Sequence, residues 1–224
     1  MTRGAASARS AATEMPFGAF LPGHVGRNRG DPRMALAAQR TQADGSDARA
    51  RLLEIIRQKS LLRGTFKLVS GATSTYYLDM KPTTFDPEGA TLIGEIICDM
   101  MQNDTDVDSI GGLELGAVPI VAAVCAQSFR GRPINGFVVR KEKKGHGTDQ
   151  KIDGNFKPNT TVVLIEDVTT KGGSVMQVVN AVRAQGATVK KIITIVDRLE
   201  GAEANLKKEG VVLAPIFTTK DLLG

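Results

Sequence analysis

Short apolar segments alternate with helical segments along residues 109–217, and this alternation limits the possible folds more than any other feature of the sequence. The expected strands cover 109–112, 134–139, 161–165, 191–196 and 211–217, and the expected helices cover 119–129 and 174–185. Strands that alternate with helices favour an α/β fold with a parallel sheet covered on both faces. Residues 162–165, Val-Val-Leu-Ile, are continuously apolar, which is typical of a central parallel strand. In such sheets ligands bind beyond the carboxyl ends of the strands.

The chain before residue 109 falls into two regions. From residue 47 the pattern predicts a helix over 47–62, a hairpin-like pair of strands over 66–69 and 75–79, and a helix over 87–102. Residues 1–46 are rich in Ala, Gly, Arg and Pro and show no sustained period. Three interpretations of 1–46 are open: a disordered tail, a true start downstream near Met34, or an Arg-rich targeting peptide, which is the least favoured. We therefore expect a single domain over 47–224.

Composition excludes several classes of protein. The 224 residues are 42% hydrophobic, as in globular chains, and no apolar run approaches the roughly 18 residues that a membrane span needs. The net charge is +5, but the excess lies in the first 40 residues and in 140–144, and aromatic residues make up only 4%. A local basic loop with few aromatic residues suits a small polyanion better than a nucleic acid. Cys98 and Cys125 are expected to be buried and reduced, which favours a cytoplasmic protein.

The segment after the expected central strand carries the most informative chemistry. It begins with two adjacent carboxylates, Glu166 and Asp167, and continues with hydroxyl residues and two glycines before the helix at Ser174. Two neighbouring carboxylates at a strand end are unfavourable unless they bind something. Backbone N–H groups and hydroxyls at a helix N-terminus bind phosphate, and carboxylates beside them can accept hydrogen bonds from sugar hydroxyls. This order of residues predicts a ribose-phosphate site in preference to a solvated loop, and it matches neither a P-loop nor a dinucleotide fingerprint.

The same segment resembles the motif with which type I phosphoribosyltransferases bind 5-phosphoribosyl 1-pyrophosphate (PRPP). The resemblance extends from Val163 to Gly172. It implies that two carboxylates hold the ribose 2- and 3-hydroxyls and that the following residues cradle the 5-phosphate. The implied PRPP-binding residues here are Glu166, Asp167, Val168, Thr169, Thr170, Lys171, Gly172, Gly173 and Ser174. The resemblance also implies the fold of that family, with a central parallel sheet flanked by helices, a small N-terminal hood subdomain and a flexible catalytic loop.

A basic run, RKEKKGHG, occupies residues 140–147 directly after an expected strand. A charge run of this kind is usually a solvated loop, although cations beside glycines could close over a departing pyrophosphate. The run resembles the catalytic loop of the orotate phosphoribosyltransferases. That resemblance implies pyrophosphate contacts from Arg140, Lys141, Lys144 and His146, and catalytic roles for Lys144, His146 and Asp167. It also implies a homodimer, because in that family the loop reaches into the neighbouring subunit's site.

Two further segments resemble the same family and imply an orotate site. Residues 66–77, FKLVSGATSTYY, resemble its stretch near the base, and Asp197-Arg198 resembles the pair whose arginine contacts orotate. The implied orotate-binding residues are Tyr77, Thr170 and Arg198. An arginine is a suitable planar partner for the carboxylate of orotate. Alternatives stay open for two of them: Tyr77 as simple core packing, and Arg198 as a surface ion pair with Asp197 or Glu200.

The sequence departs from the family at a few positions. Val69 stands where many members have a lysine before the Ser-Gly pair, and the loop 111–119 lacks the lysine that many members carry there. Backbone N–H groups of 112–116 could still bind pyrophosphate, and Lys67 or Lys81 could supply the missing charge. Lys171 inside the phosphate loop is a further variation.

The expected function is transfer of the 5-phosphoribosyl group from PRPP to orotate, giving orotidine 5′-phosphate and pyrophosphate in pyrimidine (UMP) biosynthesis. Mg²⁺ is the expected cofactor, held by substrate phosphates with no direct protein ligand. The expected partners are PRPP, orotate and a second copy of the chain, with no nucleic acid and no membrane. Two alternatives remain: a phosphoribosyltransferase for another base such as a purine, which offers no carboxylate to Arg198, and a PRPP-sensing regulatory protein. A fused decarboxylase domain, known in eukaryotic relatives, is not expected in a chain that ends at Gly224.

Overall fold

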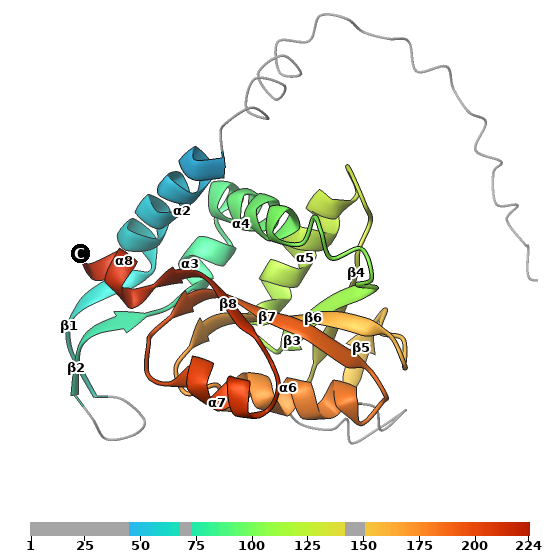
Figure 1. The fold of residues 1–224 in the computed structure, drawn as a ribbon. Coiled ribbons are helices and arrows are strands. Elements are labelled where there is room, and N and C mark those ends of the chain that lie inside the picture. Colours follow the sequence, from blue (N-terminus) through green and yellow to red (C-terminus); the bar gives the residue numbers. More distant parts are fainter. Residues whose placement is uncertain (1–44, 68–72, 142–150) are drawn as a thin grey trace, which may run out of the picture. The chain divides into compact units, whose positions relative to one another are not determined.

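The structure, a computed structural model, describes residues 45–67, 73–141 and 151–224 (Figure 1). The first elements are α2 (Gly45–Lys59), β1 (Leu61–Lys67), β2 (Thr73–Leu78), α3 (Lys81–Thr84) and α4 (Pro87–Met100). The alternating part follows with β3 (Ser109–Leu113), α5 (Ala117–Ser128), β4 (Asn135–Val139), β5 (Ile152–Gly154), β6 (Thr161–Thr169) and α6 (Gly173–Arg183). The last elements are β7 (Thr188–Asp197), α7 (Ala202–Lys208), β8 (Leu213–Thr218) and α8 (Thr219–Leu223).

A six-stranded sheet forms the centre of the alternating part, in the order β5-β4-β3-β6-β7-β8. β4, β3, β6, β7 and β8 run parallel, and β5 at the edge pairs antiparallel with β4. The predicted α/β fold with a central parallel sheet is therefore confirmed. β6 lies between β3 and β7, as its continuously apolar sequence predicts for a central strand.

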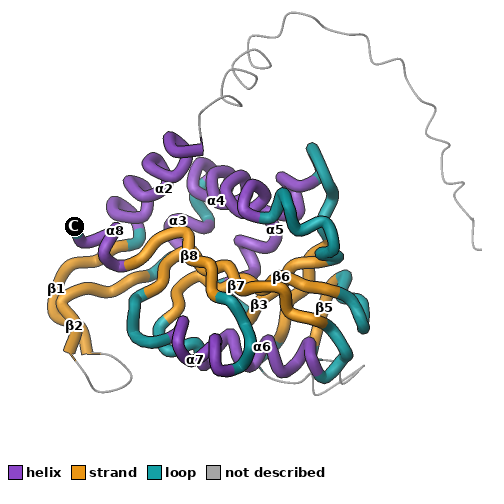
Figure 2. Tube along the Cα trace, in the orientation of Figure 1, coloured by secondary structure: helices purple, strands orange, loops and turns teal. Residues whose placement is uncertain are grey.

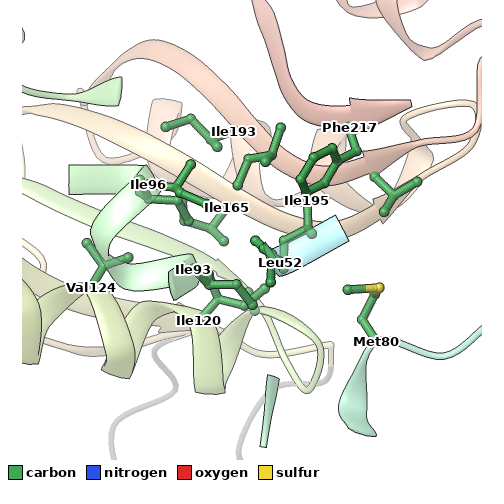
Figure 3. Packing of buried hydrophobic residues seen from close by; sticks show 14 of the residues in the cluster. Leu52, Met80, Ile93, Ile96, Ile120, Val124, Ile165, Ile193, Ile195 and Phe217 are labelled. Carbon is green, nitrogen blue, oxygen red and sulfur yellow. The ribbon is translucent and has the colours of Figure 1, made fainter. Parts of the chain in front are cut away.

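Helices cover both faces of this sheet, with α2, α4 and α5 on one face and α6 and α7 on the other (Figures 1 and 2). The side chains of β6 alternate between the two resulting cores. Val163 and Ile165 pack into the core on the α4 and α5 side, where Ile93 of α4 and Ile195 of β7 also lie (Figure 3). Val162 and Leu164 pack into the opposite core with α6. Burial on both sides, worth about 1.5–3 kcal/mol for each aliphatic side chain, holds the carboxyl end of β6 in place.

A separate two-stranded sheet is formed by β1 and β2, which pair antiparallel with Leu61 opposite Leu78 and Arg63 opposite Tyr76. The predicted hairpin-like pair of strands is therefore confirmed, but the first strand, predicted over 66–69, begins at Leu61, and the second, predicted over 75–79, begins at Thr73. Its connection, residues 68–72, contains Val69 and lies outside the described residues. Leu61 and Leu78 are buried in the same core as α2, α4 and α5, so this sheet is anchored to the main part of the fold.

Several predicted boundaries were wrong. The helix predicted over 47–62 ends at Lys59, since Ser60 turns the chain toward α3 through a 2.6 Å hydrogen bond between its hydroxyl and that of Thr83. The strand predicted over 161–165 continues to Thr169, because its pairing with β7 persists as far as Thr169 opposite Asp197. The two acidic residues predicted to follow the strand therefore lie inside it. The sequence pattern also missed α3, β5 and α7, which have four, three and seven residues.

Two glycines in β3 allow the neighbouring strands to pack closely. A Cβ atom on Gly111 would lie 2.3 Å from the ring of Phe137 on β4, and one on Gly112 would lie 2.2 Å from the carbonyl oxygen of Ile165 on β6. Any larger residue at these positions would displace the strands that position the loops beyond them. No helix in the described part of the chain is both long and apolar enough to cross a membrane.

Candidate active site at the carboxyl edge of the sheet

The loops after β3, β4, β6 and β7 emerge at one edge of the sheet because these strands are parallel. Backbone hydrogen bonds of 2.9 Å link them in pairs: the Glu114 N–H donates to the Val139 carbonyl, and the Arg198 N–H donates to the Thr169 carbonyl. The Lys141 N–H also donates to the Glu114 carboxylate, at 2.9 Å. The structure thus brings to one edge the acidic pair, the phosphate-type loop, the start of the basic run and the Asp197-Arg198 pair.

Glu166 is held in an environment that disfavours its charged form. Burial raises the pKa of Glu166 to about 8, and the neighbouring charge of Asp167 adds to the rise. Its Oε2 atom is buried and accepts no hydrogen bond from any described residue. A buried acceptor left without a donor costs about 1–3 kcal/mol. A ligand hydroxyl that donates to Oε2 would remove this cost, which makes Glu166 well suited to bind a sugar.

Asp167 lies next to the loop that follows β3. Its Oδ1 atom accepts a 2.9 Å hydrogen bond from the Val168 N–H, and a Cβ atom on Gly116 would lie 2.6 Å from Oδ2. The absence of a side chain at Gly116 therefore leaves room for this carboxylate. The acidic pair and the loop predicted to bind pyrophosphate are direct neighbours.

The phosphate-type loop joins β6 to α6. Gly172 has φ 85°, a conformation that favours glycine, and as the N-cap residue before α6 it offers no side chain to cap the helix. The carbonyl of Lys171 accepts a 3.0 Å hydrogen bond from the Asn205 side chain, which fixes the loop against α7. The Thr169 hydroxyl is buried and has no partner among the described residues.

A hollow lies in front of this uncapped helix end. Its lining consists of Glu166, Val168, Thr169, Thr170, Gly172, Gly173, Ser174 and Val175. All except Val175 belong to the predicted PRPP-binding set. Uncapped N–H groups, hydroxyls and the positive end of the helix dipole together suit a phosphate group.

Arg198 is a nearly buried cation at the end of β7. Its side chain is 10% exposed, and its Nε atom lies 2.9 Å from Glu200 Oε1 as an ion pair rather than as a directed hydrogen bond. Arg198 therefore forms the ion pair with Glu200 that was considered as an alternative, but its side chain does not lie at the surface. Its guanidinium carbon also lies 4.9 Å from the ring centroid of Tyr76.

Tyr77 points away from the core, because neighbouring residues of a strand face opposite sides. It is 43% exposed, and its ring lies 5.7 Å from that of Phe66. The alternative of simple core packing for Tyr77 is therefore wrong, and its exposed ring is available to a ligand. Sequence reasoning missed Tyr76, although the two-residue period of a strand could have shown that only one of the two tyrosines faces inward.

The structure describes only the first two residues of the basic run, Arg140 and Lys141. Arg140 forms an ion pair with Asp153 of β5, with 2.6 Å between Nε and Oδ2, and the charge of Lys141 opposes the rise in the pKa of Glu166. Lys144 and His146 lie outside the described residues. The basic run therefore starts at the carboxyl edge of the sheet, beside the acidic pair.

Lys81 lies near enough to the acidic pair to interact with it electrostatically. The pKa of Lys81 is raised mainly by its contact with Asp79, 2.6 Å from Nζ, and further by the charge of Asp167. Lys67 is exposed at the end of β1. Of the two lysines considered as replacements for the missing ones, Lys81 is the better placed.

Comparison with known proteins identifies the family of the chain. The family model "Phosphoribosyl transferase domain" matches residues 85–220. Orotate phosphoribosyltransferase from Bradyrhizobium sp. (strain BTAi1) is 43% identical over 183 residues, which cover 80% of this chain and 98% of the relative. The enzyme of that name from Methanocaldococcus jannaschii is 44% identical over 177 residues, covering 79% of this chain and 97% of the relative.

Solved structures give the same result. Orotate phosphoribosyltransferase from Mycobacterium tuberculosis matches with a TM-score of 0.71 and 35% identity, covering 79% of this chain and 99% of that chain. A structure of that enzyme in complex with PRPP matches with a TM-score of 0.68 and 34% identity, covering 78% of this chain and 98% of that chain. The fold and the relatives agree that the chain belongs to the orotate phosphoribosyltransferase family.

Proposed function

We propose that this chain transfers the 5-phosphoribosyl group from PRPP to orotate, forming orotidine 5′-phosphate and pyrophosphate in pyrimidine nucleotide biosynthesis. One observation carries the proposal. Glu166, whose buried Oε2 atom has no partner among the described residues, lines the same hollow as an uncapped helix end. A ribose 5-phosphate satisfies both features at once, since its hydroxyls donate to the carboxylates and its phosphate accepts from the helix end.

The PRPP site is proposed to use the residues at the end of β6. Glu166 and Asp167 accept hydrogen bonds from the ribose 2- and 3-hydroxyls, and Thr169 to Ser174 cradle the 5-phosphate. Two features support a cradle that is formed before the ligand binds. Gly172 adopts the backbone conformation that the turn needs, and the Asn205 side chain donates a hydrogen bond to the loop. Preorganisation of this kind reduces the entropy lost on binding.

The base is proposed to lie between the end of β7 and the small sheet. The guanidinium of Arg198 binds the carboxylate of orotate, the exposed ring of Tyr77 contacts the base, and Thr170 lies at the ribose side. Arg198 is the residue that would separate orotate from purines, because a purine has no carboxylate. Its near-complete burial supports this role, because a charge-assisted hydrogen bond is stronger where water is excluded.

Catalysis is proposed to rest on positioning and on stabilising the leaving group. The anomeric carbon gains oxocarbenium character as pyrophosphate leaves, and the attacking base nitrogen forms the new bond. Arg140, Lys141, Lys144 and His146 would neutralise the departing pyrophosphate and exclude water. Lys81 would add charge next to the loop that carries no lysine, near Asp167.

Mg²⁺ is proposed as the cofactor, and the residues present fit it. Oxygen is the ligand atom that Mg²⁺ favours, and the acidic pair Glu166 and Asp167 would place negative charge beside the ion without binding it directly. The proposed role of the two carboxylates is to hold the ribose hydroxyls, while substrate phosphates and water would hold the ion. When bound, the ion would neutralise charge on the pyrophosphate.

Two further features are proposed at the level of the whole molecule. The active form is a homodimer in which the run 140–147 of one subunit serves the site of the other, an arrangement suggested by the resemblance of that run to the family's catalytic loop. The protein acts in the cytoplasm. Cys98 and Cys125 are free thiols, as is usual in a reducing compartment, and they are half-buried rather than fully buried as predicted. Burial raises the pKa of both.

The experiment that tests the proposal is a depletion assay with PRPP and Mg²⁺, in which orotate is compared with adenine, hypoxanthine and uracil. We expect loss of orotate together with equimolar release of pyrophosphate. Turnover of a different base would retain the PRPP site and overturn the role of Arg198. PRPP binding without turnover of any base would favour the regulatory alternative.

A further inference from the structure

The guanidinium of Arg198 is held from two directions. Its carbon atom lies 4.9 Å from the ring centroid of Tyr76, within the distance at which a cation over an aromatic face is attracted. Its Nε atom lies 2.9 Å from Glu200 Oε1. The Arg198 backbone is fixed as well, since its N–H donates to Thr169 at 2.9 Å and its carbonyl accepts from the Thr219 hydroxyl at 3.2 Å.

These contacts leave one edge of the guanidinium for a ligand. Glu200 faces the Nε side and the Tyr76 ring covers one face. Among the described residues, neither Nη atom of Arg198 donates a hydrogen bond. The Nη1–Nη2 edge is planar and carries two donors in the geometry that a carboxylate accepts.

Tyr76 links two parts of the fold. It lies on β2 of the small sheet, whereas Arg198 follows β7 of the large sheet. The ring of Tyr76 is partly buried against the core on the α4 and α5 side, so its position is fixed independently of Arg198. A rigid aromatic ring is a better platform for a long side chain than solvent is, because it reduces the number of rotamers that the arginine can adopt.

We propose that Tyr76 is a positioning residue for Arg198, and that it presents the Nη1–Nη2 edge to the carboxylate of the base. This inference rests on the proposed function, in which the base is orotate. It adds a specificity-determining residue that touches no substrate itself. Tyr76 acts through the arginine, whereas its neighbour Tyr77, on the other face of β2, is proposed to contact the base directly.

Steady-state kinetics of Tyr76 variants test the inference. We expect Tyr76→Leu to raise the KM for orotate by roughly 3- to 30-fold, the range that corresponds to a lost cation–π contact. The KM for PRPP should not change, because the PRPP site keeps all its groups. Tyr76→Phe keeps the ring and should restore the wild-type KM for orotate. Phe129→Leu, at an aromatic residue that is 80% exposed after α5, is the control for nonspecific effects.

A double-mutant cycle with Arg198→Met separates positioning from packing. If Tyr76 acts through the arginine, adding Tyr76→Leu to Arg198→Met should leave the KM for orotate unchanged. A full additional penalty in that background would overturn the inference and assign Tyr76 to packing. If Tyr76→Leu does not fold, Tyr76→Met provides the same comparison.

The cycle also distinguishes this inference from the function on which it rests. If Arg198→Met leaves the KM for orotate unchanged, the proposed recognition of the carboxylate by Arg198 fails. If Arg198→Met raises this KM but Tyr76→Leu does not, the proposed function stands and the role of Tyr76 alone is refuted.

Discussion

Glu166 gives the sharpest quantitative prediction, because PRPP binding should force its carboxyl group to ionise. In the free protein burial raises the pKa of Glu166 to about 8, so that at pH 7 about nine-tenths of the molecules carry a proton on this group. The proposed hydrogen bonds from the ribose hydroxyls favour the charged form and lower the pKa in the complex. Binding at pH 7 should therefore release about 0.9 proton from Glu166 per PRPP.

The same shift sets the size of the pH effect on affinity. Ionising a group at one pH unit below its pKa costs about 1.4 kcal/mol. Apparent PRPP affinity should then rise about fivefold from pH 7 to pH 8, with a slope approaching tenfold per pH unit below pH 7, and level off above pH 8.

Isothermal titration calorimetry in buffers with different ionisation enthalpies measures the protons released. Glu166→Gln, at the same pH and Mg²⁺ concentration, is the matched control, since the substrate phosphates titrate near pH 6 in both proteins. The difference between wild type and variant should equal the protons lost by Glu166. Equal proton release by both proteins at pH 7 would refute the reasoning.

Stability of the free protein should depend on the same carboxyl group. The pKa of Glu166 in the folded state, about 8, lies above its ordinary value of 4.5, so between these values the folded state retains a proton that the unfolded state has lost. The free energy of unfolding therefore falls as pH rises through this window. In thermal unfolding without ligand, the Tm of Glu166→Gln should rise relative to the Tm of wild type as the pH increases from 5 to 9. A difference in Tm that stays constant over this range would contradict the assignment.

Three further predictions concern residues around the acidic pair. Gly172→Ala should lower the free energy of unfolding by about 1 kcal/mol, because Gly172 has φ 85°. Gly173→Ala should leave the free energy of unfolding unchanged, since a Cβ there meets no atom within 4 Å. Chemical denaturation of both variants tests this difference. Lys81→Met should weaken PRPP binding a few-fold, and more at low ionic strength, because Lys81 acts on Asp167 through charge; a salt-independent change measured by calorimetry would contradict this. Lys144→Ala should lower kcat far more than PRPP affinity, and unchanged turnover would remove the loop from catalysis.

The parallel character of the large sheet and its central strand followed from the sequence, whereas the strand order and several boundaries did not. Residues 162–165 indicate a central parallel strand because both of their faces are apolar, and in the structure Val163 and Leu164 are buried in opposite cores. The continuation of β6 to Thr169 depends on pairing with β7, which no local pattern encodes. β5 was missed because three residues carry no measurable period.

The site shows the same division between local and non-local information. The hydroxyls and glycines before α6 predict a phosphate-type loop because each residue type has a local chemical role. The burial of Glu166, and hence its raised pKa, depends on packing from elsewhere in the fold. The contact between Tyr76 and Arg198 joins residues far apart in the chain and on different sheets, so sequence spacing gave no sign of it.

The central claim is that Arg198 makes this PRPP-binding site specific for orotate. The most direct test is the ratio of kcat/KM for orotate to that for uracil, which differs from orotate by the carboxylate, in wild type and in Arg198→Met. We expect wild type to favour orotate and the variant to lose most of that preference, while PRPP binding in calorimetry stays unchanged. An Arg198→Met variant that keeps the wild-type preference for orotate over uracil would contradict the account.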